Sequence, residues 1–198
     1  MSESKLNTKI EYIDEGHIYL NDKGVIIPSC SDLIKFQYPD AYANIPERIL
    51  KQKASYGSKV HDYVERLVHD EFSLIDIKTK RIDPNIKIAL EQFELLRKSW
   101  AFVIKDMEQI VSYQGRYAGR YDMRTIDDYL IDIKTTTEIH EDWLSYQLGL
   151  YQLCLGLDKN VGYCMWLPKG KAGKVVAITP KSKEECLRLL ERYEASGK

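Results

Sequence analysis

Hydrophobic and polar positions follow two different periods along the chain, and the N-terminal third contains both. Residues 9–28 group β-forming residues around the turn sequence NDKG and end at a proline, which predicts a hairpin and a short third strand. Residues 58–70 (SKVHDYVERLVHD) place apolar side chains three and four positions apart, which predicts a helix. Asp83 and Pro84 are typical of a helix start, and the helical spacing continues to Trp100.

A period of two replaces this pattern in the middle of the chain. The runs MEQIVSYQ, RYAGRYDMRT and YLIDIKTT are separated by short turn sequences, which predicts an antiparallel meander of three strands. Residues 141–157 then read as a helix, VGYCMWL as a strand, and VVAIT as a strand after a lysine-rich turn. A last helix begins near Ser182, where SKEE fits a capping box. The central order is therefore helix, three strands, helix, strand.

Composition is consistent with one domain over residues 1–198. The chain has 198 residues, 44% of them hydrophobic, and a net charge of -1, which is enough for one sizeable core. We expect an N-terminal hairpin with helices at 9–70, a core at 83–167, and a C-terminal strand and helix at 174–195. No segment resembles an export signal or a membrane span, so a cytosolic protein is expected. The four cysteines are scattered and are expected as reduced thiols: Cys30, Cys154, Cys164 and Cys186.

The hexapeptide LIDIKT occurs twice, at 74–79 and at 130–135. The second copy is the third strand of the meander, whereas the first lies between two helices, where we expect a connecting segment. Two basic segments also stand out. One is PERILKQKASYGSK at 46–59, which includes Lys59 and precedes the predicted helix, and the other is PKGKAGK at 168–174. Each is compatible with a solvated loop or with contacts to a phosphate backbone.

Candidate chemistry gathers on the meander. Asp122 and Asp132 lie on adjacent predicted strands, so their carboxylates converge if both point to the same face. Asp132 and Lys134 share a face because they are two residues apart, while Ile131 and Ile133 point into the core. Carboxylates can hold Mg²⁺ together with the carbonyl oxygen of Ile133, and the lysine can orient water or offset charge on a phosphate. Strands with solvated charges remain the alternative.

Three segments, GRYAGRYDMR, YLIDIKTTT and YQLGLYQ, resemble the PD-(D/E)xK nuclease superfamily and specifically its RecB-like branch. The branch is marked by an acid, an acid-x-lysine, and a glutamine with a tyrosine four residues later, which here are Gln147 and Tyr151. HIYLNDKGVIIPS and SYGSKVHDYVERL extend the likeness to phage-type and mitochondrial exonucleases, so that it covers Gly16–Leu167. It implies an α/β restriction-endonuclease-like core, α-β-β-β-α-β, with a mixed central sheet flanked by helices.

The resemblance also implies a site. Metal ligation would come from His61, Asp122 and Asp132, with Lys134 as catalytic lysine and Glu108 where some members place another acid. One or two Mg²⁺ or Mn²⁺ ions are implied, and histidine suits manganese. Relatives associated with CRISPR systems often hold an iron–sulfur cluster, but the cysteines here are too dispersed, so no cluster is expected.

Further residues are candidates for substrate contacts. Glu65 lies one turn after His61 and would support the imidazole or pair with a surface lysine. Gln147 and Tyr151 share a helix face from which they reach a phosphate or the lysine, and Tyr146 beside them would stack a base. Gly119 would allow close approach of nucleic acid or a bulge. Ser29 and Ser31 would donate to a phosphate, although capping of a short helix over SDLIKF explains Ser31 equally well.

The function implied is a metal-dependent deoxyribonuclease, namely a phage-type exonuclease that hydrolyses phosphodiester bonds at DNA ends in recombination, repair or replication. Two alternatives stay open: a structure-specific or restriction-like endonuclease, and a DNA-binding module whose nuclease site has decayed. The implied partners are a duplex end or single strand of DNA and a phage single-strand annealing protein, with no membrane. A homo-oligomer is compatible with the likeness. The expected location is the cytoplasm of a bacterium or a phage-infected cell.

Overall fold

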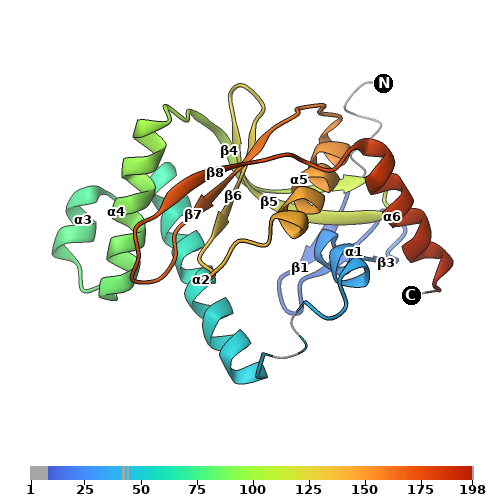
Figure 1. Ribbon diagram of the computed structural model, residues 1–198, viewed down its shortest axis with the longest axis horizontal. Helices are drawn as coiled ribbons and strands as arrows, with labels where there is room; N and C mark the ends of the chain where they lie inside the picture. The colour runs from blue at the N-terminus through green and yellow to red at the C-terminus, as the bar shows by residue number, and fades with distance from the viewer. Residues whose placement is uncertain (1–8, 42, 44, 198) are drawn as a thin grey trace.

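A central sheet of five strands separates two groups of helices in the computed structural model, which describes residues 9–41, 43 and 45–197 (Figure 1). The sheet has the order β4-β5-β6-β7-β8, and only the β6–β7 pair is parallel. The chain crosses between β6 and β7 through α5, as a parallel pair requires. The strands are β4 (Ile104–Tyr113), β5 (Tyr117–Thr125), β6 (Leu130–Lys134), β7 (Gly162–Trp166) and β8 (Lys174–Ile178).

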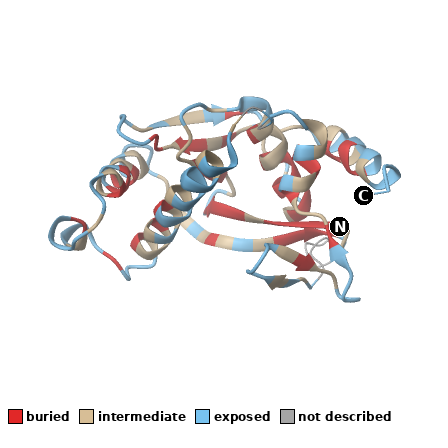
Figure 2. Cartoon of the chain, turned by 90° about the horizontal axis from the view of Figure 1, so that it is seen from below, coloured by how far each residue is buried: buried red, intermediate tan, exposed pale blue. Residues whose placement is uncertain are grey.

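Each face of the sheet has its own helical layer and core. One layer packs on Ile131 and Ile133 of β6, and it consists of α2 (Glu47–Val68), α3 (Leu74–Thr79) and α4 (Pro84–Ser99). The other layer encloses Tyr117 and Leu130 and consists of α1 (Cys30–Gln37), α5 (Glu141–Leu155) and α6 (Lys183–Ala195). Buried residues follow the strands between the two layers (Figure 2). The prediction that Ile131 and Ile133 face the core is confirmed, because both are 1% exposed.

The N-terminal hairpin is present as a second, smaller sheet. Strands β1 (Glu11–Ile13), β2 (Ile18–Leu20) and β3 (Ile26–Ile27) pair antiparallel in sequence order. Ala118 of β5 packs beneath this sheet, against Tyr19 and Ile27. The central meander, the long α5, the strand after it and the C-terminal helix capped by Ser182 also form as predicted.

Three local predictions were wrong. Helix α2 begins at Glu47 instead of residue 58, so the first basic segment is helical surface and not a loop before the helix. Ser29, not Ser31, caps α1: its side chain accepts a hydrogen bond from Asp32 N, and the Asp32 side chain accepts one from Ser29 N. The first LIDIKT copy forms α3 because Ser73 and Asp76 make the same kind of capping box.

Candidate metal centre

Three side chains from three elements meet beside the central sheet. His61 extends from α2, Glu108 from β4 and Asp122 from β5, and one ligand atom of each lies within 4.8 Å of the others. His61 Nδ1 is 3.4 Å from Glu108 Oε1 and 3.6 Å from Asp122 Oδ1. Its other ring nitrogen, Nε2, is 3.2 Å from the carbonyl oxygen of Ile133. The imidazole is therefore surrounded by oxygen atoms on both sides.

This oxygen environment favours a positive charge on His61. Burial alone would lower its pKa, but the carboxylates of Asp122 and Glu108 outweigh burial and raise the pKa to about 9. The carboxyl of Asp122 is itself buried, which raises its pKa, whereas His61 and Lys134 act in the opposite direction. A proton on the imidazole thus partly compensates two recessed acids in the metal-free protein.

Asp122 also determines how β5 and β6 meet. The two strands pair at Met123–Ile131 and Arg124–Leu130. One residue further on, Asp122 Oδ2 accepts a hydrogen bond of 2.6 Å from the backbone N–H of Ile133. A side chain here replaces the next backbone bond of the ladder, and the carboxylate is held beside the Ile133 carbonyl and His61. Asp122 thus contacts the backbone of the acid-x-lysine strand, and the convergence of its carboxylate with that of Asp132 stays a prediction.

A second line of polar groups runs from β6 to α5. Lys134 Nζ donates to Asp132 Oδ1 at 2.9 Å and to Gln147 Oε1 at 3.2 Å. Gln147 Nε2 in turn lies 3.5 Å from the hydroxyl of Tyr151, which donates to the carbonyl oxygen of Arg120 at 2.8 Å. Gln147 therefore reaches the lysine as predicted, whereas Tyr151 contacts Gln147 and the Arg120 carbonyl instead of the lysine.

The Asp132–Lys134 pair is buried enough to change the acidity of both groups. Burial raises the pKa of Asp132 to about 6, although Lys134 acts to lower it. Burial lowers the pKa of Lys134, but the carboxylates of Asp132 and Asp122 more than offset this, so the pKa lies above its ordinary value. The lysine is therefore an ammonium ion at neutral pH in the metal-free protein, which suits a hydrogen-bond donor better than a general base.

One oxygen atom in this group lacks a hydrogen bond. Asp132 Oδ2 is buried, and among the described residues no donor forms a hydrogen bond with it, even though Lys134 Nζ lies 2.8 Å away. The positive charge of Lys134 compensates this buried oxygen, although their contact lacks the geometry of a hydrogen bond. Among the described residues, the group with metal-ligand spacing is His61, Glu108 and Asp122, whose mainly oxygen ligands fit a divalent cation. Asp132, which was also predicted as a ligand, is not in that group and contacts Lys134 instead.

Arg120 is a site residue that sequence reasoning missed. Its Nε lies 2.8 Å from Glu108 Oε2, and its guanidinium carbon is 5.6 Å from the centre of the Tyr12 ring. Glu108 has a φ of 49°, a left-handed conformation that is rare for residues other than glycine and is found at functional sites. The sequence signal was present, because Arg120 precedes Asp122 by two positions on one strand and so shares its face.

His61, Glu108, Arg120 and Lys134 open into a cavity of about 1120 Å³. Helix α2 forms one wall, and the segment 135–140 after β6 forms another. The helix comes close to this segment at Gly57, where a Cβ atom would lie 3.2 Å from the hydroxyl oxygen of Thr135. Glu65 lines the same cavity, as its spacing from His61 predicted.

Four other predicted substrate residues do not line this cavity. Ser29 is engaged in capping α1, Ser31 is exposed on that helix, and Lys59 is exposed on α2. The ring of Tyr146 packs instead against Tyr38, with a centroid distance of 6.1 Å, and under the ammonium of Lys181. The capping and packing contacts of Ser29 and Tyr146 leave little freedom to bind nucleic acid.

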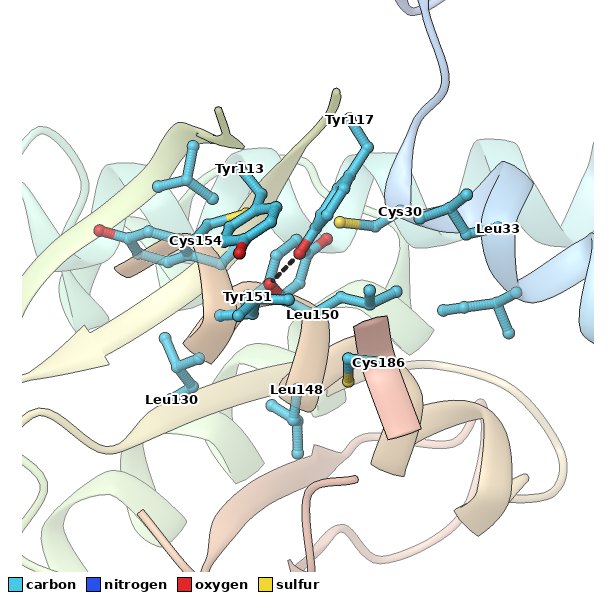
Figure 3. Close-up of a cluster of buried hydrophobic side chains, with 14 of the residues drawn as sticks. Cys30, Leu33, Tyr113, Tyr117, Leu130, Leu148, Leu150, Tyr151, Cys154 and Cys186 are labelled. Atoms are coloured by element: carbon cyan, nitrogen blue, oxygen red, sulfur yellow. Dashed lines mark hydrogen bonds between the residues drawn. The ribbon is translucent and has the colours of Figure 1, made fainter. Parts of the chain in front are cut away.

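Gly119 has a packing role. A Cβ atom there would lie 2.7 Å from both Cys30 Sγ and Tyr151 Cε1, so the glycine allows α1 and α5 to approach β5 closely. Figure 3 shows Cys30 and Tyr151 in the buried cluster beside this strand, together with Cys154 and Cys186. All four cysteines are buried and free. The expectation of unpaired thiols is confirmed, and of the core and surface positions left open by the sequence, all four cysteines take core positions.

Comparisons with known proteins do not place the chain in a family. No family model matches it, and no curated protein matches it. A solved structure titled "Crystal structure of SSO0001" aligns over 82% of this chain and 72% of its own, with 15% identity and a TM-score of 0.42. That score is too low to establish a shared fold. Among the described residues, no helix has both the length and the apolar character needed to cross a bilayer.

Proposed function

We propose that the protein is a metal-dependent deoxyribonuclease of the PD-(D/E)xK type, acting as an exonuclease at DNA ends. The observation that carries the proposal is that a group of three possible metal ligands lies next to a buried acid–lysine pair. His61, Glu108 and Asp122 form a set with the spacing of metal ligands, and the Ile133 carbonyl connects it to the Asp132–Lys134 pair. The order of the elements also supports a restriction-endonuclease-like core, because it matches the expected helix, three strands, helix and strand: α4, β4, β5, β6, α5, β7.

The residues that would hold Mg²⁺ or Mn²⁺ are His61, Glu108, Asp122 and Asp132, with the Ile133 carbonyl. A bound divalent ion lowers the pKa of water and offsets charge on a phosphate. Manganese accepts a histidine ligand more readily than magnesium does, so Mn²⁺ is expected to support the higher activity.

The protein's own polar groups orient the reacting parts. Lys134 carries a proton and a positive charge, and it can donate to a water molecule or to a phosphate oxygen beside Asp132. Gln147 fixes the ammonium through its amide oxygen, and Tyr151 is itself fixed to the Arg120 carbonyl. Loss of any one of these contacts would misplace the lysine, and positioning errors of about 1 Å can cost roughly 100-fold in rate.

The direct test is cleavage of labelled linear duplex DNA by the purified protein with Mg²⁺ or Mn²⁺ titrated from zero. Cleavage should require the metal and should be lost in Asp132→Ala, while Asp76→Ala, in the other LIDIKT copy, should retain it. A decayed DNA-binding module would bind DNA but cleave it with neither metal. Binding and cleavage that both ignore the metal and Asp132→Ala would make the nuclease proposal wrong.

Dependence on DNA ends separates the exonuclease from the endonuclease alternative. A linear duplex, a nicked circle and a single-stranded circle can be compared in one gel. An exonuclease should degrade the linear duplex and leave the intact single-stranded circle, whereas an endonuclease should linearise or fragment the circle.

A further inference from the structure

The two basic segments, which are more than a hundred residues apart in sequence, meet at the cavity of the candidate metal centre. Lys53 of α2 and Lys169 of the β7–β8 turn both line it. Lys169 Nζ lies 5.5 Å from the centre of the Tyr56 ring, so the aromatic side chain lies close to the turn lysine. Other lysines of the two segments, Lys59 and Lys171, are exposed but do not line the cavity. Each basic segment therefore contributes one lysine to the cavity wall.

Helix α2 connects this basic end to the metal centre by a regular stripe. Lys53, Gly57, His61 and Glu65 follow one another at intervals of four residues, and all four line the cavity. At a rise of about 1.5 Å per residue, Lys53 lies roughly 12 Å along the helix from His61. This corresponds to no more than about four nucleotides at the ~3.4 Å rise of a stacked strand.

The wall beside Lys53 is apolar without being part of a core. Ile45, Ile49 and Leu50 line the cavity and are partly exposed, and none belongs to the hydrophobic clusters that the described residues form. Figure 1 shows the N-terminal part of α2 reaching past the sheet to the edge of the molecule. Apolar side chains beside lysines can contact unpaired bases while the lysines contact phosphates.

The size and shape of the cavity decide between one strand and two. Its volume of about 1120 Å³ slightly exceeds the ~300–1,000 Å³ of pockets that enclose a drug-sized ligand. A duplex is much larger, since its two grooves alone are about 12 Å and about 6 Å wide. At Gly57 the absence of a side chain keeps α2 from crowding the segment after β6, since a Cβ atom there would lie 3.2 Å from the hydroxyl oxygen of Thr135.

We propose that this cavity is a binding track for a single unpaired DNA strand, with Lys53 and Lys169 as phosphate contacts and Ile45, Ile49, Leu50 and Tyr56 as base contacts. The inference rests on the proposed nuclease function in one respect, namely that the bound strand runs toward the metal centre in order to be cleaved there. A strand must then separate from its complement before its phosphate reaches His61 and Asp122.

Binding in EDTA tests the track without cleavage. Fluorescence anisotropy would compare a short labelled oligothymidylate with a blunt hairpin duplex of equal charge, using Lys53→Ala/Lys169→Ala and the matched control Lys59→Ala/Lys171→Ala. Each pair removes two charges from the same two elements. The cavity pair should weaken single-strand binding at least tenfold and reduce the slope of log affinity against log salt by about 1.4, from ~0.7 per contact. The control should change binding less than twofold.

Gain in affinity with oligonucleotide length should level off near four to six nucleotides, and the blunt duplex should bind at least tenfold more weakly. Equal effects of the two lysine pairs, or equal binding of duplex and single strand, would overturn the track. If the track variants lose binding but the wild type cleaves no DNA with Mg²⁺ or Mn²⁺, the nuclease proposal fails and the track stands. If the protein cleaves DNA in a metal-dependent way but substitution of Lys53 and Lys169 has no effect on binding, the nuclease proposal stands and the track is wrong.

Discussion

The guanidinium of Arg120 pairs with Glu108 on the side opposite His61: Arg120 Nε lies 2.8 Å from one carboxylate oxygen, and His61 Nδ1 lies 3.4 Å from the other. Glu108 is therefore shared between a group that would take part in metal binding and a permanent cation. A metal ion bound by Glu108 must compete with the arginine, which keeps its charge at all ordinary pH values.

Replacing Arg120 with alanine should consequently affect metal and DNA in opposite directions. Without Arg120, no permanent cation competes with the metal for the Glu108 carboxylate. Mn²⁺ affinity measured by calorimetry in the absence of DNA should therefore rise severalfold. Cleavage should fall by tenfold or more, because a guanidinium in the cavity suits a phosphate oxygen. Arg116→Ala is the matched control, since Arg116 pairs with Glu194 at 2.6 Å, and neither residue lines the cavity. Weaker Mn²⁺ binding by Arg120→Ala would mean that the arginine orients Glu108 for the metal instead of competing with it.

The two LIDIKT lysines provide an internal comparison. Lys134 contacts Asp132 and Gln147 in the buried site, whereas Lys78 is exposed on α3. Lys134→Ala should lower the cleavage rate roughly 100- to 1,000-fold, the usual cost of losing a donor to developing charge. Lys78→Ala should stay within twofold of wild type in the same single-turnover assay. Equal losses in both variants would contradict the assignment of chemistry to the second copy.

The same hexapeptide also shows where sequence reasoning succeeded and where it could not. In the second copy, local alternation agrees with the environment, because β6 has a strand on each side. In the first copy the same residues form a helix, because Ser73 precedes them and closes a capping box with Asp76. The Ser-x-x-Asp signal was visible in the sequence, as was the one at Ser29 and Asp32 that caps α1. Alternation within six residues was simply too short to decide the element.

Other site features depend on contacts between distant segments. The strand positions of Asp122, Asp132 and Lys134 could be predicted because they lie in a meander with a clear period of two, whereas Gln147 and Tyr151 were expected from the resemblance to RecB-like nucleases. The ion pair of Glu108 with Arg120 and the meeting of Lys53 with Lys169 depend on how strands and helices pack, which no local pattern states. The start of α2 was missed because its first turns carry apolar residues that face a cavity instead of a core.

Protonation of His61 predicts how stability depends on pH in the metal-free protein. Its folded-state pKa is raised from 6.5 to about 9, so its contribution to the free energy of unfolding is fully present below about pH 6.5 and is lost as pH rises through about 9. Urea unfolding in EDTA should show this decline, and His61→Gln should remove it. His69→Gln, at an exposed position just after α2, should leave the decline unchanged.

Metal binding should show the opposite pH dependence over the same range. A divalent ion requires neutral imidazole, so each proton lost from His61 favours the metal, and apparent Mn²⁺ affinity should rise between about pH 6.5 and 9. Affinity that does not change across this interval would indicate that the metal is held without His61.

Gly119 links packing to the position of Tyr151. In Gly119→Ala the new methyl group would lie 2.7 Å from Cys30 Sγ and Tyr151 Cε1, so both helices must shift away from β5. Overpacking of this kind costs about 2 kcal/mol, which corresponds to a fall in Tm of roughly 4–8 °C for a chain of this size. Cleavage at 25 °C should fall further than stability explains, because Tyr151 would no longer reach the Arg120 carbonyl and Gln147 would lose its neighbour.

A second substitution separates these two effects. Gly119→Ala/Cys30→Ala removes the sulfur contact but leaves the contact with the Tyr151 ring, so thermal unfolding should recover part of the lost Tm while cleavage stays low. Tyr151→Phe, which keeps the ring and removes only the hydroxyl, should lower cleavage with a smaller loss of stability. Full activity in both the double variant and Tyr151→Phe would show that the hydrogen-bonded line from Lys134 through Gln147 to Tyr151 does not position the lysine.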